Sequence, residues 1–395
     1  MRYRLPRTFL AAALGVVVAA GAAACASSTS TAAPAVNLSK TPAQYNLKAA
    51  GCPSTIVLQT DWDPEAEHGG QYEMLGPNPT INTSAKEVTG ELVAHGGIPT
   101  GVQLQIRAGG PAIGYQSVTA EMYQDSSITL GYLATDAQVA ESKSQPTVAV
   151  MAAMEISPQI IQWSAQEHPA WTSIADIGKS NEKVLYYQGT SFINYLTGEG
   201  LLKQSQVVGS YDGTPTAFVA SGGQYATQAY ATAEPYIWSH DVSSWDKPMK
   251  YELVADTGFN YYQQELVVRK DKLAGLSSCL NKLVPIMQQA TVDYMANPTP
   301  TEKLIVELAK DYNNGWTYNL GTAQYAVATM KKLGIIGNAP GGALGAFEDS
   351  RVQHIISILE PIYTAQRTPF LAGLTASDLV TNQFIDPSIK LPDGS

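Results

Sequence analysis

The chain has 395 residues, of which 45% are hydrophobic and 15% charged, and its formal net charge at pH 7 is −10. This composition is typical of a globular protein and excludes an intrinsically disordered chain, which carries more charge and fewer apolar residues. The acidic balance argues against nucleic acid as a partner and against a surface that grips anionic lipid headgroups, because both need a basic face. The length is sufficient for more than one lobe.

The N-terminal region has the layout of a secretory signal. Three arginines precede an apolar run over residues 9–20, and small residues lead to Cys25. A cysteine directly after small residues resembles a bacterial lipoprotein signal, in which the cysteine becomes the new N-terminus and carries the lipid. Ala22 departs from that pattern, where Leu or Val is usual, and the alternative is an ordinary signal peptide with a chance cysteine.

The resemblance implies a signal peptide over residues 1–25 and a flexible tether over 26–50, which includes the small, polar stretch SSTSTAAP. It also implies an extracytoplasmic protein that the lipid on Cys25 anchors to the outer face of the bacterial cell membrane. No later stretch approaches the roughly 20 apolar residues that a membrane helix needs.

Two further cysteines, Cys52 and Cys279, remain once Cys25 is assigned to the lipid. An even pair in an oxidising compartment favours a disulfide. The alternative is two buried free thiols.

Strands alternate with helical stretches through the first two thirds of the chain. Short β-branched or apolar runs predict strands at 55–60, 101–106, 128–133 and 147–153. The helical stretches between most of them indicate a largely parallel sheet with α/β architecture. The stretch 71–98, rich in Asn, Pro and Gly, is interpreted as a long loop.

A second series of elements follows. Strands or strand ends are predicted at 183–187, 207–211, 251–258 and 264–273, with a helix that starts near Gly189. The intervening stretch is interpreted as a helix, a Gly-Gly break and a short segment that ends at Glu234-Pro235.

From Leu276 onward the pattern is mainly helical, with Thr301 as a predicted cap and a capping-box-like pair at Thr375 and Asp378. The strand at 264–273 would return the chain to the first sheet. We therefore predict a two-lobed α/β fold in which each lobe is a mixed, mostly parallel sheet flanked by helices, and two crossing strands join the lobes. The predicted boundaries are 51–153 plus 259–395 for lobe 1 and 154–258 for lobe 2.

The stretch TIVLQTDWDPEAEHGGQY, residues 55–72, resembles the first strand and loop of substrate-binding proteins of ABC importers. The branch is the one that binds thiamine-pyrimidine precursors, nitrate, sulfonates and taurine. The residues that match its pattern are Asp61, Trp62, Pro64, His68, Gly70 and Tyr72. Three later segments, at 171–196, 231–238 and 374–385, resemble the start of the second lobe, a Glu-Pro at the cleft and the closing helix.

The resemblance covers residues 55–385 and implies the type 2 periplasmic-binding-protein fold. It further implies a monomeric binding protein without enzymatic activity or cofactor, which serves a membrane permease and its ATPase. The sequence departs from the pyrimidine-precursor members in lacking the Cys-rich cluster of their eukaryotic biosynthetic relatives, in the variant Gly69-Gly70-Gln71, and in the long loop at 71–98.

Ligands of such a fold bind at the C-terminal ends of strands and at helix N-termini. Trp62 is expected to stack on a flat ring or to cap an aliphatic chain, and Asp61 to accept a hydrogen bond from an amino group. The alternative is a core tryptophan and a turn-capping aspartate. His68 either donates to the ligand or supports the two glycines after it.

Two helix starts and several side chains complete the predicted site. Backbone N–H groups and hydroxyls at 135–136 and 189–191 suit a carbonyl or anionic group, and plain N-caps are the alternative. Glu234 is the acidic candidate of lobe 2, with a hinge salt bridge as its alternative. The full set of predicted ligand-binding residues is Asp61, Trp62, His68, Tyr72, Thr135, Asp136, Gly189, Thr190, Ser191, Glu234, Tyr236 and Tyr261.

Motifs of catalysis are missing from the sequence. The five histidines show no pair at metal-ligand spacing, there is no Gly-x-Ser-x-Gly elbow, and the Gly-rich stretch at 107–117 lacks a phosphate-loop lysine. An enzyme or a ligand sensor with the same fold remains the less favoured alternative.

The acidic candidates Asp61 and Glu234 favour a neutral or cationic nitrogen heterocycle, such as a pyrimidine, as ligand. Nitrate or a sulfonate would favour Arg or Lys in the motif loops, which carry none. Backbone N–H groups alone can bind anions, so an anion stays the alternative.

Overall fold

A computed structural model describes residues 38–392. The predicted signal peptide, the predicted lipidation site Cys25 and the first part of the predicted tether lie outside the described residues. Within 38–392, no helix is both long and apolar enough to span a bilayer.

Seven strands form one sheet in the order β2-β3-β4-β1-β5-β12-β6. Parallel pairs join β4, β1 and β5, whereas β3 and β12 run antiparallel to their neighbours, so five strands share one direction. The strands are β1 (Thr55–Gln59), β2 (Thr80–Asn82), β3 (Glu87–Ala94), β4 (Ile98–Arg107), β5 (Ile128–Leu133), β6 (Thr147–Ala152) and β12 (Glu265–Arg269). We call this sheet with its helices the large lobe.

A second sheet has five strands in the order β11-β7-β10-β8-β9, and we call it with its helices the small lobe. β10, β8 and β9 pair in parallel, and β7 runs antiparallel between β11 and β10. The strands are β7 (Gln159–Ser164), β8 (Val184–Leu185), β9 (Val207–Val208), β10 (Ala226–Tyr230) and β11 (Met249–Leu253). Both sheets are mixed and mostly parallel in direction, which confirms the predicted fold class.

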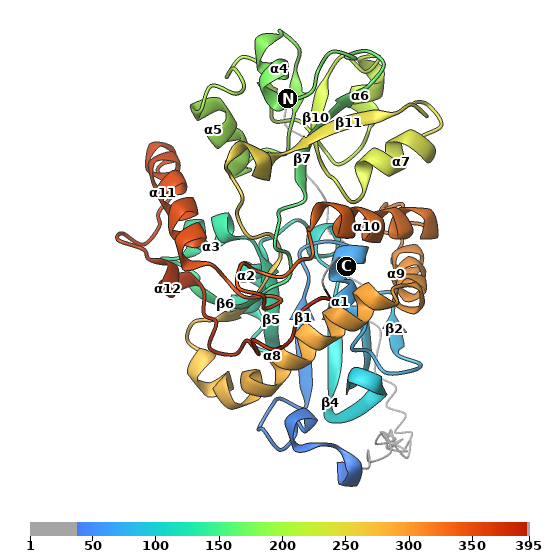
Figure 1. Ribbon diagram of the computed structural model, residues 1–395, viewed down its shortest axis with the longest axis vertical. Coiled ribbons are helices and arrows are strands. Elements are labelled where there is room, and N and C mark those ends of the chain that lie inside the picture. The colour runs from blue at the N-terminus through green and yellow to red at the C-terminus, as the bar shows by residue number, and fades with distance from the viewer. Residues whose placement is uncertain (1–37, 393–395) are drawn as a thin grey trace, which may run out of the picture. The chain divides into compact units, whose positions relative to one another are not determined.

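Helices flank both sheets (Figure 1). Those packed with the large lobe are α1 (Gly69–Tyr72), α2 (Val118–Gln124), α3 (Thr135–Glu141), α8 (Leu273–Ala296), α9 (Thr299–Tyr312), α10 (Leu320–Leu333), α11 (Asp349–Gln366) and α12 (Ala376–Leu379). The small lobe has α4 (Ile174–Lys179), α5 (Ser191–Gly198), α6 (Thr216–Ala220) and α7 (Glu234–His240). β1, β5 and β6 are buried almost throughout because helices cover both faces of the large sheet.

The chain crosses between the sheets twice, over 153–158 and over 254–264. Arg351 of α11 ties the two crossings together. Its Nε donates to the backbone oxygen of Asn260 at 2.7 Å, and its Nη1 donates to Glu155 at 2.9 Å. The guanidinium also lies 3.7 Å from the ring centre of Tyr262. One partly buried cation therefore holds both connections at a fixed spacing.

Cys52 and Cys279 are joined by a disulfide, with their Cα atoms 4.8 Å apart. The bond links the segment before β1 to the first turns of α8. It closes a loop of 227 residues that contains the whole small lobe.

Some predicted elements differ from the structure. The stretch 71–98 is not a plain loop, since it contains the β2–β3 hairpin on the edge of the large sheet. β7 and β10 were not predicted, because each carries glutamines or threonine among few apolar residues. Thr301 does not cap α9, which begins two residues earlier; its hydroxyl donates to Glu73 instead. The capping box of Thr375 and Asp378 is present.

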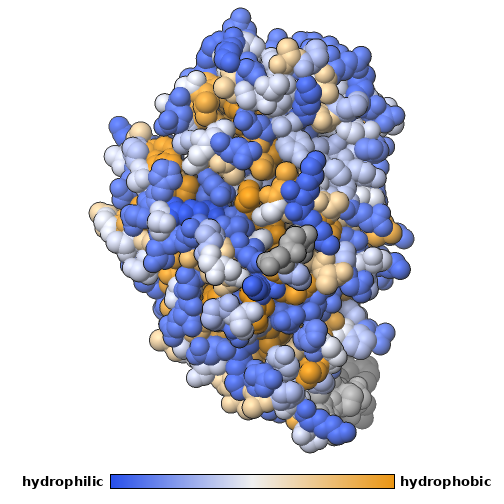
Figure 2. All heavy atoms as spheres, viewed as in Figure 1, coloured by the Kyte–Doolittle hydropathy of each residue, from blue (hydrophilic) through white to orange (hydrophobic). Residues whose placement is uncertain are grey.

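Most large apolar side chains are buried. Tyr115, Tyr187 and Leu371 are the exposed exceptions within the described residues. Figure 2 shows hydrophilic and hydrophobic residues interspersed over the viewed face. Two of these three residues, Tyr115 and Tyr187, line one cavity between the two lobes.

Candidate functional site

A cavity of about 550 Å³ lies between the lobes, at the ends of β1, β4 and β5 on one side and of β10 on the other. The large lobe contributes Asp61, Trp62, Asp63, Glu65, Gly110, Pro111, Tyr115, Gln116, Ala134, Asp136, Tyr261, Gln263, Asn314, Gly315 and Trp316. The small lobe contributes Gln159, Tyr187, Thr190, Phe192, Tyr211, Asp212, Gly213, Thr214, Gln228, Ala229, Tyr230, Ala233 and Glu234. A second cavity, of about 510 Å³, opens at the opposite ends of the strands β1, β5 and β12 and holds none of the predicted site residues.

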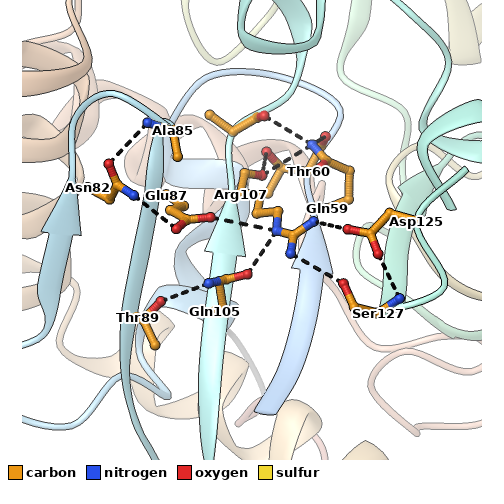
Figure 3. Close-up of polar contacts among 11 residues, drawn as sticks. Gln59, Thr60, Asn82, Ala85, Glu87, Thr89, Gln105, Arg107, Asp125 and Ser127 are labelled. Carbon is orange, nitrogen blue, oxygen red and sulfur yellow. Dashed lines mark hydrogen bonds and ion pairs between the residues drawn. The ribbon is translucent and has the colours of Figure 1, made fainter. Parts of the chain in front are cut away.

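Hydrogen bonds fix the loop that follows β1 (Figure 3). The Thr60 hydroxyl donates to the backbone oxygens of Trp62 and Arg107, at 2.7 and 3.0 Å. The Gln59 amide donates to the backbone oxygen of Ala108 at 3.0 Å. Because both side chains bridge β1 to the end of β4, the residues just after β1 are held at the cavity.

The Gly-rich stretch at 107–117 forms a wall of this cavity. Gly110 has a φ of 53°, and a Cβ there would lie 2.6 Å from the indole of Trp62. A Cβ on Gly109 would lie 2.2 Å from the backbone oxygen of Thr60. Only glycine permits this close approach of the two loops. The sequence interpretation as an ordinary loop missed this role.

Aromatic rings form a row along this wall. The ring centre of Trp62 lies 6.1 Å from those of both Trp316 and Tyr115, and Tyr115 lies 6.3 Å from Tyr187 of the small lobe. Tyr115 adopts a φ of 60°, which is rare for a non-glycine residue. Such rings offer flat faces to a ring-shaped or cationic ligand.

Six carboxyl side chains line the cavity: Asp61, Asp63, Glu65, Asp136, Asp212 and Glu234. Asp63 and Glu65 are 1% and 3% exposed. Burial raises the pKa of both carboxyls, and for Glu65 the neighbouring Glu67 and Asp61 add to the shift. Burial likewise raises the pKa of Glu234 to about 7.

Among the described lining residues there is no Lys, Arg or His. Arg107, at the end of β4, does not line the cavity, because its guanidinium is hydrogen-bonded to Asp125 and Gln105 (Figure 3). Its Nη1 donates to Asp125 at 2.7 Å and its Nε to Gln105 at 2.8 Å. The hydrogen bond from Arg107, together with those from Ser127, lowers the pKa of Asp125 to about 2. The cavity is therefore acidic and has no basic counterpart of its own.

Two of the hydrogen bonds that join the lobes lie beside the cavity. Ser191 of α5 donates to Asp136 of α3 at 2.5 Å, and Thr232 donates to Glu67. Each bond pairs a small-lobe hydroxyl with a large-lobe carboxyl. The lobes are thus in contact around the cavity.

Half of the predicted site residues line the cavity: Asp61, Trp62, Asp136, Thr190, Glu234 and Tyr261. Trp62 is only partly buried, so it is not the core residue of the alternative interpretation. Glu234 makes no ion pair within residues 38–392, which argues against the hinge salt bridge. Its carboxyl accepts a hydrogen bond from the backbone N–H of Tyr230 at 2.7 Å.

His68 and Tyr72 do not line the cavity, because both are buried behind the first loop. Nε2 of His68 lies 3.1 Å from Asp61, and its ring stacks on Tyr132 with centres 4.9 Å apart. The two following glycines are needed for packing, since a Cβ on Gly69 would lie 2.1 Å from the ring of Tyr294 in α8. The histidine-glycine motif thus positions Asp61.

Thr135 also lies outside the cavity lining. Its backbone N–H and its hydroxyl both donate to groups within the large lobe and are not available to a ligand. Its N–H donates to the backbone oxygen of Tyr262 at 3.0 Å, and its hydroxyl donates to Glu265 at 2.5 Å. Ser191 is 2% exposed and is occupied by Asp136. Gly189 supplies a turn with a φ of 99° before α5.

Tyr236 belongs to α7 and packs against α10, and it does not line the cavity. Its ring centre is 4.3 Å from that of His240 and 5.2 Å from that of Tyr325. Tyr230 at the end of β10, which the sequence analysis did not select, does line the cavity. Other lining residues that were missed come from loops far apart in the chain, such as Tyr115, Tyr187 and Trp316.

No protein-family profile and no curated protein matches this sequence. Solved structures do match its fold. The alkanesulfonate-binding protein SsuA of Xanthomonas axonopodis pv. citri, bound to MOPS, matches with a TM-score of 0.52 and 11% identity over 83% of this chain and 98% of its own. The periplasmic aliphatic sulphonate-binding protein SsuA of Escherichia coli matches with a TM-score of 0.52 and 12% identity, over 80% of this chain and 94% of its own.

A ligand-binding component of an ABC-type import system from Staphylococcus aureus matches with a TM-score of 0.51 and 10% identity, over 83% of this chain and 98% of its own. The chain therefore has the two-lobed fold of the substrate-binding proteins of ABC importers. These neighbours are transport proteins and not enzymes. Identity this low shows a common fold and leaves the ligand to be argued from the cavity.

Proposed function

We propose that this protein is an extracytoplasmic solute-binding protein, which captures one small molecule between its lobes and delivers it to an ABC permease with its ATPase. The observation that carries the proposal is the cavity itself, which is lined by both lobes and flanked by the Ser191–Asp136 hydrogen bond. Neither lobe alone encloses it, so capture and closure are one event. The moving bodies would be residues 51–153 plus 259–395 and residues 154–258.

The ligand we favour is a small nitrogen heterocycle, such as an aminopyrimidine. Trp62 and the tyrosines offer faces on which a flat ring stacks, and the carboxyls of Asp61 and Glu234 accept hydrogen bonds from amino groups. A pyrimidine-sized molecule also fits within about 550 Å³.

An anion is the second candidate, since proteins of this fold include sulfonate-binding members. The lining argues against it. A sulfonate or nitrate adds negative charge to a cavity with six carboxyl groups and no basic side chain among its described residues. Binding would then depend on backbone N–H groups alone.

Native mass spectrometry of the protein purified from its own host without unfolding tests this proposal. We expect one small molecule per chain, released on denaturation and identifiable as a nitrogen heterocycle. The Trp62→Ala variant, purified in parallel, should carry less of it. A sulfonate in the wild type would select the second candidate, and a protein that never carries or binds any solute would refute both.

The anchoring of the protein is a separate part of the proposal. The N-terminal signal supports cleavage before Cys25 and lipidation of that residue. A fatty-acid probe should label the wild type in cells and leave Cys25→Ser unlabelled. Equal labelling of both proteins would contradict the lipoprotein assignment and leave the binding function untouched.

A further inference from the structure

We propose that the ligand of this cavity is an organic cation that carries N–H donors at more than one point, such as an aminated heterocyclic cation or a diamine. The inference rests on the proposed binding function and narrows its ligand class from nitrogen compounds in general to positively charged ones. It excludes both anions and quaternary ammonium ions, which have no N–H group.

The first argument is uncompensated charge. The six lining carboxyls have no basic partner among the described lining residues. Behind the lining, His68 lies 3.1 Å from Asp61 and 3.6 Å from Glu65, and the nearby Arg and Lys side chains are engaged elsewhere. Arg107 pairs with Asp125, Arg351 with Glu155, and Lys86 donates to the backbone oxygen of Tyr312. Burial raises the pKa of Asp63, Glu65 and Glu234, so the neutral form is favoured while no cation is near, and a bound cation favours the ionised form. A positively charged ligand supplies that cation.

The second argument is independent of charge and concerns unpaired acceptors. Oδ2 of Asp63 and Oε1 of Gln263 have no hydrogen-bond partner among the described residues. Both side chains line the cavity and are only 1% and 7% exposed. Buried polar atoms are almost always satisfied in native proteins. Two buried acceptors that face a cavity therefore point to a ligand with N–H donors, and a sulfonate would bring further acceptors only.

The third argument is where the carboxyls lie. Asp136 stands at the start of α3, whereas Asp63 accepts a hydrogen bond at 2.7 Å from Asn314, just after α9. Figure 1 shows α3 and α9 on opposite flanks of the large sheet. Asp61, Glu65 and Glu234 lie at the same cavity as both. Acceptors at both flanks fit a cation whose donors are separated along its length.

Aromatic faces complete the recognition of a cation. Trp62, Tyr115 and Tyr230 line the same cavity, and ring faces attract ammonium and guanidinium groups. An acidic cavity walled by rings discriminates against anions twice, through repulsion from the carboxylates and from the π-electron faces.

The test uses ligand-stripped protein and calorimetric titration with compounds matched for size. The probes are 1,5-diaminopentane, spermidine and 2-methyl-4-amino-5-aminomethylpyrimidine as N–H cations, the bis-trimethylammonium analogue of diaminopentane as a cation without N–H, and MOPS as an anion. We expect at least one N–H cation to bind with 1:1 stoichiometry and at least 10-fold tighter than the quaternary analogue and MOPS. Tightest binding of MOPS, equal binding of the quaternary analogue, or no binding of any N–H cation overturns the inference.

Variants separate a specific site from general attraction. Asp63→Asn and Glu234→Gln should each weaken the best cation about 10- to 100-fold, the range expected for a lost charge-assisted hydrogen bond. Glu302→Gln is the matched control, because Glu302 is a buried carboxyl outside the cavity, and it should bind as the wild type does. Asp136→Asn, on a less buried residue, serves if Asp63→Asn does not fold. Equal affinity in all cavity variants would refute the inference.

Failure of this inference is distinguishable from failure of the proposed function. Binding of MOPS or a neutral solute in the cavity would end the cation inference and leave a solute-binding protein. Absence of any bound solute, in titration and in protein purified from its host, would end both.

Discussion

Ser191, at the start of α5 in the small lobe, donates a 2.5 Å hydrogen bond to Asp136, at the start of α3 in the large lobe. Asp136 lines the cavity, while Ser191 is buried behind it. The bond therefore couples contact between the lobes to the position of a cavity carboxyl. The sequence predicted the helix starts at 135–136 and 189–191 as separate halves of the site, and this hydrogen bond connects them directly.

Ser191→Ala should weaken ligand binding about 2- to 10-fold, since it removes one hydrogen bond that forms only when the lobes meet. The melting temperature of the ligand-free protein should change little. Calorimetric titration with the co-purified ligand measures the affinity. Ser239→Ala removes a hydroxyl that donates within α7, away from the cavity, and is the control. Unchanged affinity in Ser191→Ala would rule out this coupling.

Trp62→Ala should weaken binding by about 1–3 kcal/mol through lost aromatic burial, with little effect on the melting temperature of the free protein. Trp238→Ala is the contrasting variant, because Trp238 is 1% exposed in the core of the small lobe. It should destabilise the fold by about 3–5 kcal/mol. If Trp62→Ala melts far lower and binds normally, Trp62 is structural and the site is misplaced.

Gly110→Ala and Gly114→Ala form a matched pair. Both glycines have positive φ, 53° and 62°, so alanine strains the backbone at each. Only at Gly110 would the new Cβ meet Trp62, at 2.6 Å, whereas nothing lies within 4 Å at Gly114. The melting temperature should thus fall for both variants. The affinity for the ligand should be at least several-fold lower in Gly110→Ala than in Gly114→Ala. Equal affinities would show that the Gly-rich loop does not position Trp62.

The structure also shows which features a single sequence can and cannot reveal. β1, β5 and β6 were predictable because buried parallel strands are continuous apolar runs. β7 and β10 were not, because Gln159, Gln162 and Thr227 interrupt their apolar pattern. Trp62 and Asp61 were found through a local motif. Tyr115, Tyr187 and Trp316 were missed, since no local pattern signals that three distant loops converge.

Stability should depend on pH through Glu234. Burial and the neighbouring Glu67 raise its pKa to about 7, from about 4.5 in an unfolded chain. The folded protein therefore holds this proton more tightly, and the stability it contributes is complete below about pH 4.5 and is lost as pH rises through 7, by up to about 3 kcal/mol. Facing groups are Glu65, Glu67, Tyr211 and the Tyr230 backbone N–H, with no cation among them.

Urea unfolding of the ligand-free protein at pH 5 and pH 8 measures this dependence. Glu234→Gln cannot ionise and should lose less stability between the two pH values than the wild type. Cation affinity should rise over the same interval, because ionised Glu234 attracts the ligand. A wild type and variant with identical pH dependence would contradict the assignment.

The disulfide between Cys52 and Cys279 should be detectable as one linked peptide pair in non-reducing mapping of the mature protein. In the double variant Cys52→Ser/Cys279→Ser the free energy of unfolding should be about 2–5 kcal/mol lower, as is typical when a native disulfide is removed. Ligand affinity should stay near that of the wild type, since neither cysteine lines the cavity. Two thiols that react freely with an alkylating agent under denaturation without reductant would exclude the bond.

Small-angle X-ray scattering of the same protein, stripped of ligand and then reloaded with the co-purified molecule, tests the central claim most directly. Capture between two lobes predicts a smaller radius of gyration on loading, because closure brings the lobes together about the segments at 153–158 and 254–264. Ser191→Ala should close less completely at equal ligand concentration. Saturating ligand that binds without any change in the radius of gyration would contradict capture by closure.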